Sequence, residues 1–512
     1  MKKKCSNVGV VILVLSLTLM STTAIYAQRF VDVPAGYGTL QSIIAADSAN
    51  RVANPNTVYL VHRGNADSVY YLTSTLTNWG SMPLQIISVG AGAIPRFILT
   101  TLSDGSAISP MISARANLTL KGVFLDGLNT LGVTVDRVVR VQGDSVRVVL
   151  DSVQLNLSTQ SFVRVDNTKA RIYLKDCRVS NVFSDWANAR GVDNRGVTID
   201  TLSVVGCSFY RLGFRVYRDG GGILKYGYFD HNTIVEMGNS ILGLGSTINI
   251  TFTNNLAVNC AFLGQGPASN GRLLGINALP GSGQTSYIRN NVFDSDSAAL
   301  AAAYHAMGDT LRPVPWFADT LVAVINNAGL AGTNISSHVS FVMPPGNLAG
   351  AVKVDSIVRW YYRNPSVNGG DASILKVDHT ELVNLAYNTD APAYTFGSDG
   401  KPVGATDWFG ITLAVKNDPE GTIPARFSLD HNYPNPFNPS TTINYALPHA
   451  GHVTLVVYDL LGRQVGTLVD GAQSAGNYRT TFDARGLASG TYIYRLNVDG
   501  RIVGARTMLL LK

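Results

Sequence analysis

A short motif recurs seven times between residues 118 and 295, and this repeat limits the possible folds of the chain more than any other feature. Each copy has an alternating strand pattern, a polar or small residue at a bend, and a second short alternating run. The equivalent bend positions are Gly122, Ser152, Asp176, Gly206, His231, Asn254 and Asn290, which are 23 to 36 residues apart. A constant core unit with variable spacing indicates coils of one solenoid, with loops of different length inserted between the strands.

The position after each bend predicts how the interior of this solenoid is ordered. In chain order these positions hold Val123, Val153, Cys177, Cys207, Asn232, Asn255 and Asn291. Equivalent residues of successive coils lie about 4.8 Å apart in a parallel sheet, so small apolar residues stack first and three asparagines then form a ladder. Stacked amides donate and accept along the axis, which allows asparagine to be buried. For Cys177 and Cys207 we favour two buried free thiols over a disulfide, because in-register strand neighbours rarely have disulfide geometry.

The repeat resembles the right-handed parallel β-helix of the pectate-lyase-like superfamily, over about residues 31–295. The beginning of this range agrees with the resemblance, because Leu40, Ile43 and Ile44 recur at helical spacing. A short amphipathic helix is therefore expected to cap the first coil, whose strand is Thr57–His62. Such a cap is needed because an open solenoid end exposes apolar core and unpaired strand edges.

Residues 296–415 repeat less regularly, and we interpret them as the C-terminal coils and cap of one β-helix domain, 28–415. The expected elements are a short helix at Ser297–Met307 and strands at Val354–Tyr362 and Ala372–Val377. The sequence from Tyr394 to Phe409 is similar to the closing sequence of secreted β-helix proteins. Residues 416–427 are the expected linker to the next domain.

The segment 428–512 has alternating runs separated by turn signals, which predicts a small immunoglobulin-like β-sandwich. The runs are Thr442–Leu447, Val453–Tyr458, Tyr478–Phe482, Tyr492–Asn497 and Ile502–Leu511. Asp499-Gly500 is typical of a two-residue hairpin turn, which requires positive φ at both central positions. The chain is therefore expected to be all-β, with a right-handed parallel β-helix followed by this sandwich.

Four motifs in the same segment carry a second resemblance. They are NYPNPFNPST at 432–441, VYDLLGR at 457–463, SGTY at 489–492 and MLLLK at 508–512. The segment closely resembles the type A C-terminal sorting domain of the type IX secretion system. The resemblance implies that the type IX machinery exports the protein by way of residues 428–512. It also implies a secreted or outer-surface location, and it carries no catalytic information.

The N-terminus predicts the first step of the same route. Lysines at positions 2–4 precede the apolar run Val8–Met20, and Ala27 is a small residue suited to cleavage. We therefore expect residues 1–27 to be a signal peptide for Sec-dependent export through the periplasm, and no membrane span in the mature protein. Removing these three lysines lowers the formal net charge from +6 to +3, which argues against a nucleic-acid partner.

The stretch from Arg211 to His231 combines charged and aromatic side chains and is the strongest candidate for chemistry. The outer face of a solenoid sheet, together with its inserted loops, forms a groove suited to a polysaccharide. Cleavage of a uronate chain by β-elimination requires a neutralised carboxylate and a base, and calcium or arginine can neutralise it. We nominate Lys225, Arg215 and Arg218 as catalytic residues, Tyr217, Tyr226, Tyr228 and Arg211 as substrate-binding residues, and Asp219 and Asp230 as calcium ligands.

Two hypotheses of different class remain open. The first is a surface protein that binds or degrades an acidic polysaccharide, as a polysaccharide lyase or a glycan hydrolase. The second is a non-catalytic adhesin or structural solenoid, in which these side chains are only solvated outward positions of successive coils. The enzyme requires Arg215, Asp219, Lys225 and Asp230 to point into one groove, whereas their scattering over different faces argues against it.

Overall fold

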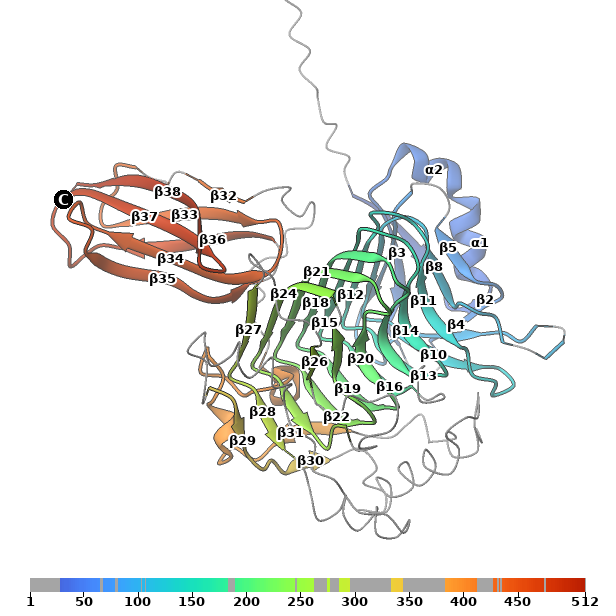
Figure 1. Cartoon of the computed structure of the whole chain (residues 1–512). Coiled ribbons are helices and arrows are strands. Elements are labelled where there is room, and N and C mark those ends of the chain that lie inside the picture. Colours follow the sequence, from blue (N-terminus) through green and yellow to red (C-terminus); the bar gives the residue numbers. More distant parts are fainter. Residues whose placement is uncertain are drawn as a thin grey trace, which may run out of the picture.

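The computed structural model is a parallel β-solenoid followed by an antiparallel β-sandwich (Figure 1). The structure describes residues 28–64, 68–78, 82–102, 104–105, 107–182, 189–244, 246–261, 274–276, 285–294, 333–343, 383–411, 427–430, 432, 435–473 and 476–511. The predicted signal peptide, the helix at Ser297–Met307 and the strands at Val354–Tyr362 and Ala372–Val377 lie outside these residues, as do residues 416–426 of the predicted linker.

Three parallel sheets form the solenoid, and a complete coil contributes one strand to each of them, in the order A, B, C. Sheet A contains β1 (Arg29–Val33), β3 (Thr57–His62), β6 (Leu84–Val89), β9 (Leu118–Lys121), β12 (Arg147–Asp151), β15 (Ala170–Lys175), β18 (Thr198–Val205), β21 (Ile223–Asp230), β24 (Ser246–Thr253) and β27 (Thr285–Arg289). Sheet B contains β2 (Gly36–Tyr37), β4 (Val69–Leu72), β7 (Arg96–Leu99), β10 (Phe124–Asn129), β13 (Gln154–Ser158), β16 (Arg178–Val182), β19 (Ser208–Leu212), β22 (Thr233–Met237), β25 (Leu256–Val258), β28 (Val292–Asp294) and β29 (Ile335–Ser336). Sheet C contains β5 (Leu76–Asn78), β8 (Ile112–Ala114), β11 (Arg137–Val141), β14 (Ser161–Val165), β17 (Arg190–Asn194), β20 (Arg215–Arg218), β23 (Leu242–Leu244) and β26 (Leu274–Ile276). The predicted parallel solenoid is confirmed, with about eight turns.

The bend between sheets A and B has the stacked interior that the sequence predicts. The backbone N–H and side-chain Nδ2 of Asn232 both donate to Asn255 Oδ1, at 3.0 and 2.9 Å. Asn255 repeats both bonds to Asn291 Oδ1, and Asn291 repeats them to Asn334, which extends the predicted ladder by one rung. Cys177 and Cys207 are free and buried, so the predicted free thiols are confirmed.

The bend residues themselves have left-handed backbone, which explains why small or short polar residues fill most of these positions. All seven predicted positions have a φ between 49° and 65°. Glycine adopts this conformation without strain, and asparagine and aspartate tolerate it better than most residues do. A second left-handed column, which the sequence analysis missed, lies at the C-terminal ends of sheet B strands and comprises Leu157, Asn181, Arg211 and Glu236.

Two short helices, α1 (Thr39–Ala46) and α2 (Ser48–Ala53), follow the first strand. Leu40 and Ile44 of α1 are buried in the solenoid core, as the predicted helical cap requires. Asp47, between the helices, binds the Arg29 guanidinium at 2.6 Å. This bond, rather than burial, dominates and lowers the pKa of the Asp47 carboxyl to about 2.

Residues 391–409 form a strap along the side of the solenoid. The strap follows β30 (Phe341–Met343) and β31 (Asn384–Tyr387), and it contains the turns η1 (Pro392–Tyr394) and η2 (Thr406–Phe409). Asn290 Nδ2 donates to its Phe396 carbonyl at 3.1 Å, and Trp408 Nε1 donates to Ser208 Oγ at 2.7 Å. Because Ser208 belongs to an earlier coil than Asn290, the strap runs back along the solenoid and fastens neighbouring coils together.

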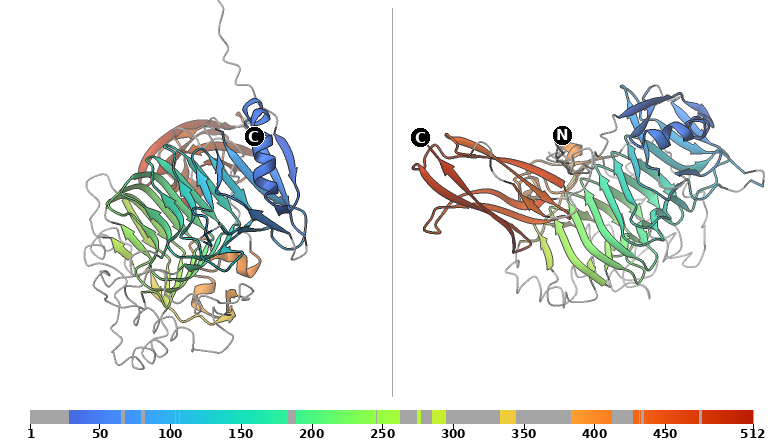
Figure 2. Two further views of the ribbon diagram at one scale, coloured as in Figure 1. Left: turned by 90° about the vertical axis from the view of Figure 1, so that its right-hand side faces the viewer. Right: turned by 90° about the horizontal axis from the view of Figure 1, so that it is seen from above.

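The C-terminal sandwich has two antiparallel sheets around its own apolar core. One sheet contains β32 (Ser428–Leu429), β33 (Ser440–Leu447) and β36 (Gly476–Asp483); the other contains β35 (Gln464–Gln473), β34 (Gly451–Tyr458), β37 (Gly490–Val498) and β38 (Arg501–Leu510). All five predicted runs are strands, and β35 is an additional strand that alternation did not reveal. Asp499 and Gly500 have φ of 51° and 77°, as the predicted hairpin turn requires. The sandwich lies beside sheet A at the β27 end of the solenoid (Figure 2).

Candidate functional site

The nine nominated site residues lie on three different sheets and do not form one groove. Arg211 is on β19 of sheet B; Arg215, Tyr217 and Arg218 are on β20 of sheet C, with Asp219 directly after it; and Lys225, Tyr226, Tyr228 and Asp230 are on β21 of sheet A. The three nominated catalytic residues are therefore divided between two sheets, with Lys225 on sheet A and Arg215 and Arg218 on sheet C. This scattering argues against one catalytic group built from all of them.

Two nominated substrate-binding residues are buried within the solenoid itself. Tyr217 is 0% exposed within the solenoid core, and its hydroxyl lies 3.4 Å from Asn194 Nδ2. Arg211 is 1% exposed and forms an ion pair with Glu236 at 3.4 Å. Both residues support the fold, and neither is positioned to contact a polysaccharide.

Lys225 and one nominated calcium ligand are held by other side chains. Lys225 Nζ lies 2.7 Å from Asp200 Oδ1. Asp230 Oδ1 accepts hydrogen bonds from Thr253 Oγ1 at 2.7 Å and Asn254 Nδ2 at 2.9 Å. Asp219 and Asp230 lie on different sheets, so they cannot share one ion. Among the residues that the structure describes, no cluster of three or more His, Cys, Asp or Glu side chains could hold a metal ion.

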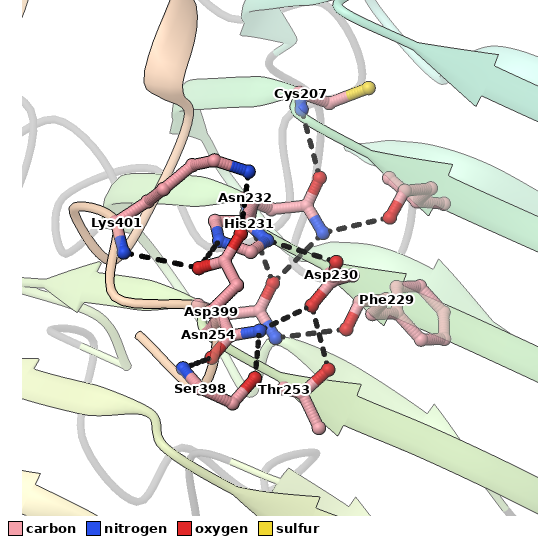
Figure 3. A network of polar contacts seen from close by, with 12 residues as sticks. Cys207, Phe229, Asp230, His231, Asn232, Thr253, Asn254, Ser398, Asp399 and Lys401 are labelled. Carbon is pink, nitrogen blue, oxygen red and sulfur yellow. Dashed lines mark hydrogen bonds and ion pairs between the residues drawn. The ribbon is translucent and has the colours of Figure 1, made fainter. Parts of the chain in front are cut away.

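Instead, Asp230 belongs to a buried network that fastens the strap to the solenoid (Figure 3). His231 Nδ1 lies 2.9 Å from Asp230 Oδ2, and His231 Nε2 lies 3.4 Å from Asp399 Oδ1 of the strap. Lys401 Nζ contacts the other oxygen of Asp399 at 2.7 Å. Burial alone would lower the pKa of His231, but the two carboxylates outweigh it and raise this pKa to about 9. The imidazolium between two carboxylates is therefore a structural clasp.

The most distinctive charged surface is the outer side of sheet C, which we call the arginine face. Strand register places Arg140, Arg164, Asp193 and Arg218 in one column, one residue from each of four successive coils. The partly exposed arginines of this face include Arg140, Arg164, Arg195 and Arg218, with 17 to 39% of each side chain accessible. Arg190, at 2% exposed, is buried beside them.

Ion pairs order these arginines without neutralising them. Asp166 is shared by Arg140 and Arg164, whose Nε atoms lie 2.5 and 2.8 Å from its two oxygens. Asp193 is similarly shared, lying 2.8 Å from Arg190 and 3.4 Å from Arg218. Each guanidinium has five N–H donors, so an arginine that uses one or two on aspartate keeps others for a further anion. The side chains of Arg140, Arg164 and Arg218 remain 29%, 17% and 31% exposed.

Arg215 is held differently from its neighbours. Its guanidinium lies over the Phe214 ring, 4.5 Å from the centroid, and over Gly243 of the next coil. A Cβ atom at position 243 would lie 2.1 Å from Arg215 Nη1, so this glycine makes room for the guanidinium. Burial lowers the pKa of Arg215 to about 10, against the opposing effect of Asp219.

The fold defines the class of the protein, which is a parallel β-solenoid with a separate C-terminal antiparallel β-sandwich. Residues 431–508 match the family described as secretion system C-terminal sorting domain, so the sandwich carries the type IX secretion signal. Comparison with curated proteins gives no match for the chain. Within the described residues, no helix has the length and apolar character needed to cross a membrane.

Proposed function

We propose that this is a secreted or cell-surface β-helix protein that binds an acidic polysaccharide along the arginine face of sheet C. The type IX sorting domain supports export to the outer surface. Sec-dependent passage through the periplasm, with removal of residues 1–27, is the proposed first step of that route. The resemblance to the pectate-lyase-like superfamily agrees with a polysaccharide ligand and remains a prediction.

The column of Arg140, Arg164 and Arg218 is the observation that carries this proposal. Neighbouring strands are about 4.8 Å apart, so Arg140 and Arg164 are one rung apart and Arg218 lies two rungs further along. An extended uronate chain lying parallel to the solenoid axis presents carboxylates at intervals of similar length. Bidentate arginine–carboxylate bonds would then hold the chain, and their strength would fall as salt screens the charges.

Soluble glycans and the full chain provide the test. The dissociation constants of polygalacturonate, alginate and neutral dextran are measured by isothermal titration calorimetry at low and high salt. We expect binding of at least one polyuronate, weakened about tenfold or more by Arg164→Gln or Arg218→Gln, because a hydrogen bond to a charged group contributes about 1.5–3 kcal/mol. Arg171→Gln on sheet A is the matched control and should leave affinity unchanged. Equal affinity in all three variants contradicts the proposed site.

Eliminative cleavage is the alternative to binding alone, and it would need either Arg215 or Lys225 to act as the base. In this reaction a base takes the C5 proton of a uronate, the C4–O bond breaks, and the glycosidic oxygen leaves with a proton taken from water. The product has a C4=C5 double bond that absorbs in the ultraviolet. Absorbance that appears with a polyuronate and disappears in Arg215→Gln, but not in Lys225→Gln, supports a lyase. Binding without any such product, with or without calcium, leaves a non-catalytic adhesin.

A further inference from the structure

The C-terminal sandwich covers a row of tyrosines on sheet A. The contact is made mainly by the turn between β33 and β34, near His449 and Ala450, and by the beginning of β34. Ala450 packs with Val205 and Tyr228 of the solenoid in a small apolar cluster, to which Ala472 adds from the edge strand β35. Tyr228 is 3% exposed as a result of its position under the sandwich.

Two imidazole rings of the sandwich stack on two of these tyrosines. The His449 ring lies 3.7 Å from the Tyr226 ring, centroid to centroid, with 10° between their planes. The His452 ring lies 4.7 Å from the Tyr287 ring, at 29°. His452 Nε2 is also 3.2 Å from Arg289 Nη2. The solenoid therefore presents two flat aromatic faces to two flat rings.

The register of sheet A arranges these groups as a strip along the solenoid axis. Tyr228 and Tyr287 occupy one column, with Thr251 between them, so they are about 10 Å apart by strand spacing. Tyr226 lies two residues before Tyr228 on the same outer face of β21. Arg289 and Asn249 border the tyrosines and supply hydrogen-bond donors. Aromatic faces flanked by such donors are suited to pyranose rings, whose C–H faces pack on aromatics while their hydroxyls bond polar groups.

We propose that the tyrosine strip is a second carbohydrate-binding site, specific for the ring faces of a polysaccharide, that the sorting domain masks until it detaches. The site is independent of the arginine face, because it lies on another sheet and depends on stacking rather than on charge. The covering rings occupy the places of two sugar rings. Glycan bound to the protein before export would hinder its transport through the secretion machinery. Covering the site with the sorting domain would prevent such premature binding.

The contact itself is suited to release. Burial lowers the pKa values of both His449 and His452, and Arg289 lowers that of His452 further. Among the described residues, the sandwich contributes two small side chains, Ala450 and Ala472, to the apolar centre of the contact. A large charged side chain introduced at Ala450 should therefore separate the two domains while each keeps its own core.

Native affinity electrophoresis of the full chain through gels containing xylan or hydroxyethylcellulose tests this inference. We expect the wild-type chain to migrate nearly as in a gel without glycan, and Ala450→Arg to be retarded at least threefold. Adding Tyr226→Ala and Tyr287→Ala to that variant should abolish the retardation. Leu461→Arg is the matched control, since it adds the same charge to an exposed turn of the same domain and should not bind. These neutral glycans do not report on the arginine face, so this test and the polyuronate test fail independently.

Small-angle X-ray scattering shows whether Ala450→Arg has separated the domains, by an increase in the radius of gyration. If it has not, a protease site introduced within residues 416–426 separates them by cleavage, and the same electrophoresis is repeated. Separation without retardation overturns the proposal. Retardation that persists without the two tyrosines overturns it as well, because the glycan would then bind elsewhere.

Discussion

Replacing Asn255 by alanine tests the asparagine ladder, the feature that holds sheets A and B together at their bend. Asn255 is 0% exposed. Its Oδ1 accepts from the backbone N–H and Nδ2 of Asn232, and its Nδ2 donates to Asn291 Oδ1 and to the Phe229 carbonyl at 3.0 and 3.1 Å. The substitution removes these four bonds at once.

The cost follows from the groups that lose their partners. The Asn232 backbone N–H stays buried but loses its acceptor, which costs about 1–3 kcal/mol. Asn232 Nδ2 keeps its bond to the Val204 carbonyl, so it adds little. The small cavity left by the amide adds about 1 kcal/mol. We expect Asn255→Ala to lower the free energy of unfolding by about 3 kcal/mol.

Guanidinium unfolding followed by circular dichroism measures this change, with refolding from denaturant as a check of reversibility. Asn249→Ala is the matched control, because Asn249 lies on the same strand, β24, but on the outer face, where its Nδ2 donates to the Lys225 carbonyl at 3.3 Å. Its substitution should cost less than about 1 kcal/mol. Equal midpoints for the two variants would refute the assignment of the ladder as a main source of stability.

Three further predictions concern the strap, the arginine face and the domain contact. His231 is charged in the folded protein between Asp230 and Asp399, with Lys401 nearby. Raising the pKa of His231 from 6.5 to about 9 contributes about 3 kcal/mol to the free energy of unfolding, which is present below pH 6.5 and is lost as the pH rises through 9. The unfolding midpoint of the wild-type protein should therefore fall over that pH range, while that of His231→Gln stays nearly constant. Gly243→Ala should displace Arg215 and weaken polyuronate affinity at least threefold by calorimetry, whereas Gly471→Ala, where a Cβ meets no atom within 4 Å, should not. The contact between the sandwich and the solenoid favours neutral His449 and His452, so acidification below pH 6.5 should separate the two domains and increase the radius of gyration. Asp470 and Asp499 oppose this effect of protonation, and Arg289 reinforces it. An unchanged radius of gyration at low pH would contradict the prediction.

The periodic part of the structure could be predicted from the sequence, because each coil repeats the same physical requirement. A bend position needs left-handed backbone, and the next position needs a residue that stacks on its equivalents in neighbouring coils. The sequence alone therefore predicts Gly122 as a bend residue and Asn255 as a member of the ladder. The hairpin at Asp499-Gly500 was predictable for the same reason. Alternation and turn-forming residues were therefore sufficient to predict the strands and turns whose conformation depends on local sequence alone.

The sequence could not predict which of the nominated side chains point outward, because departures from regular strand geometry decide this and the alternation of polar and apolar residues does not show them. Arg211 has a φ of 57° in the second left-handed column, where it forms an ion pair with Glu236 of the next coil. Tyr217 faces inward beside Val192 of the neighbouring strand, although its charged neighbours suggested a solvated position. The Asp230–His231–Asp399 clasp was also missed, since Asp399 is 168 residues from His231 in the sequence and only tertiary packing brings them together.

A crystal structure of the full chain with a bound hexamer of galacturonate tests the central claim most directly. We expect the oligosaccharide to lie along sheet C, parallel to the solenoid axis, with its carboxylates bonded to Arg140, Arg164 and Arg218. Density for the hexamer on another face at saturating concentration, with these three arginines bonded only to Asp166 and Asp193, would contradict the claim.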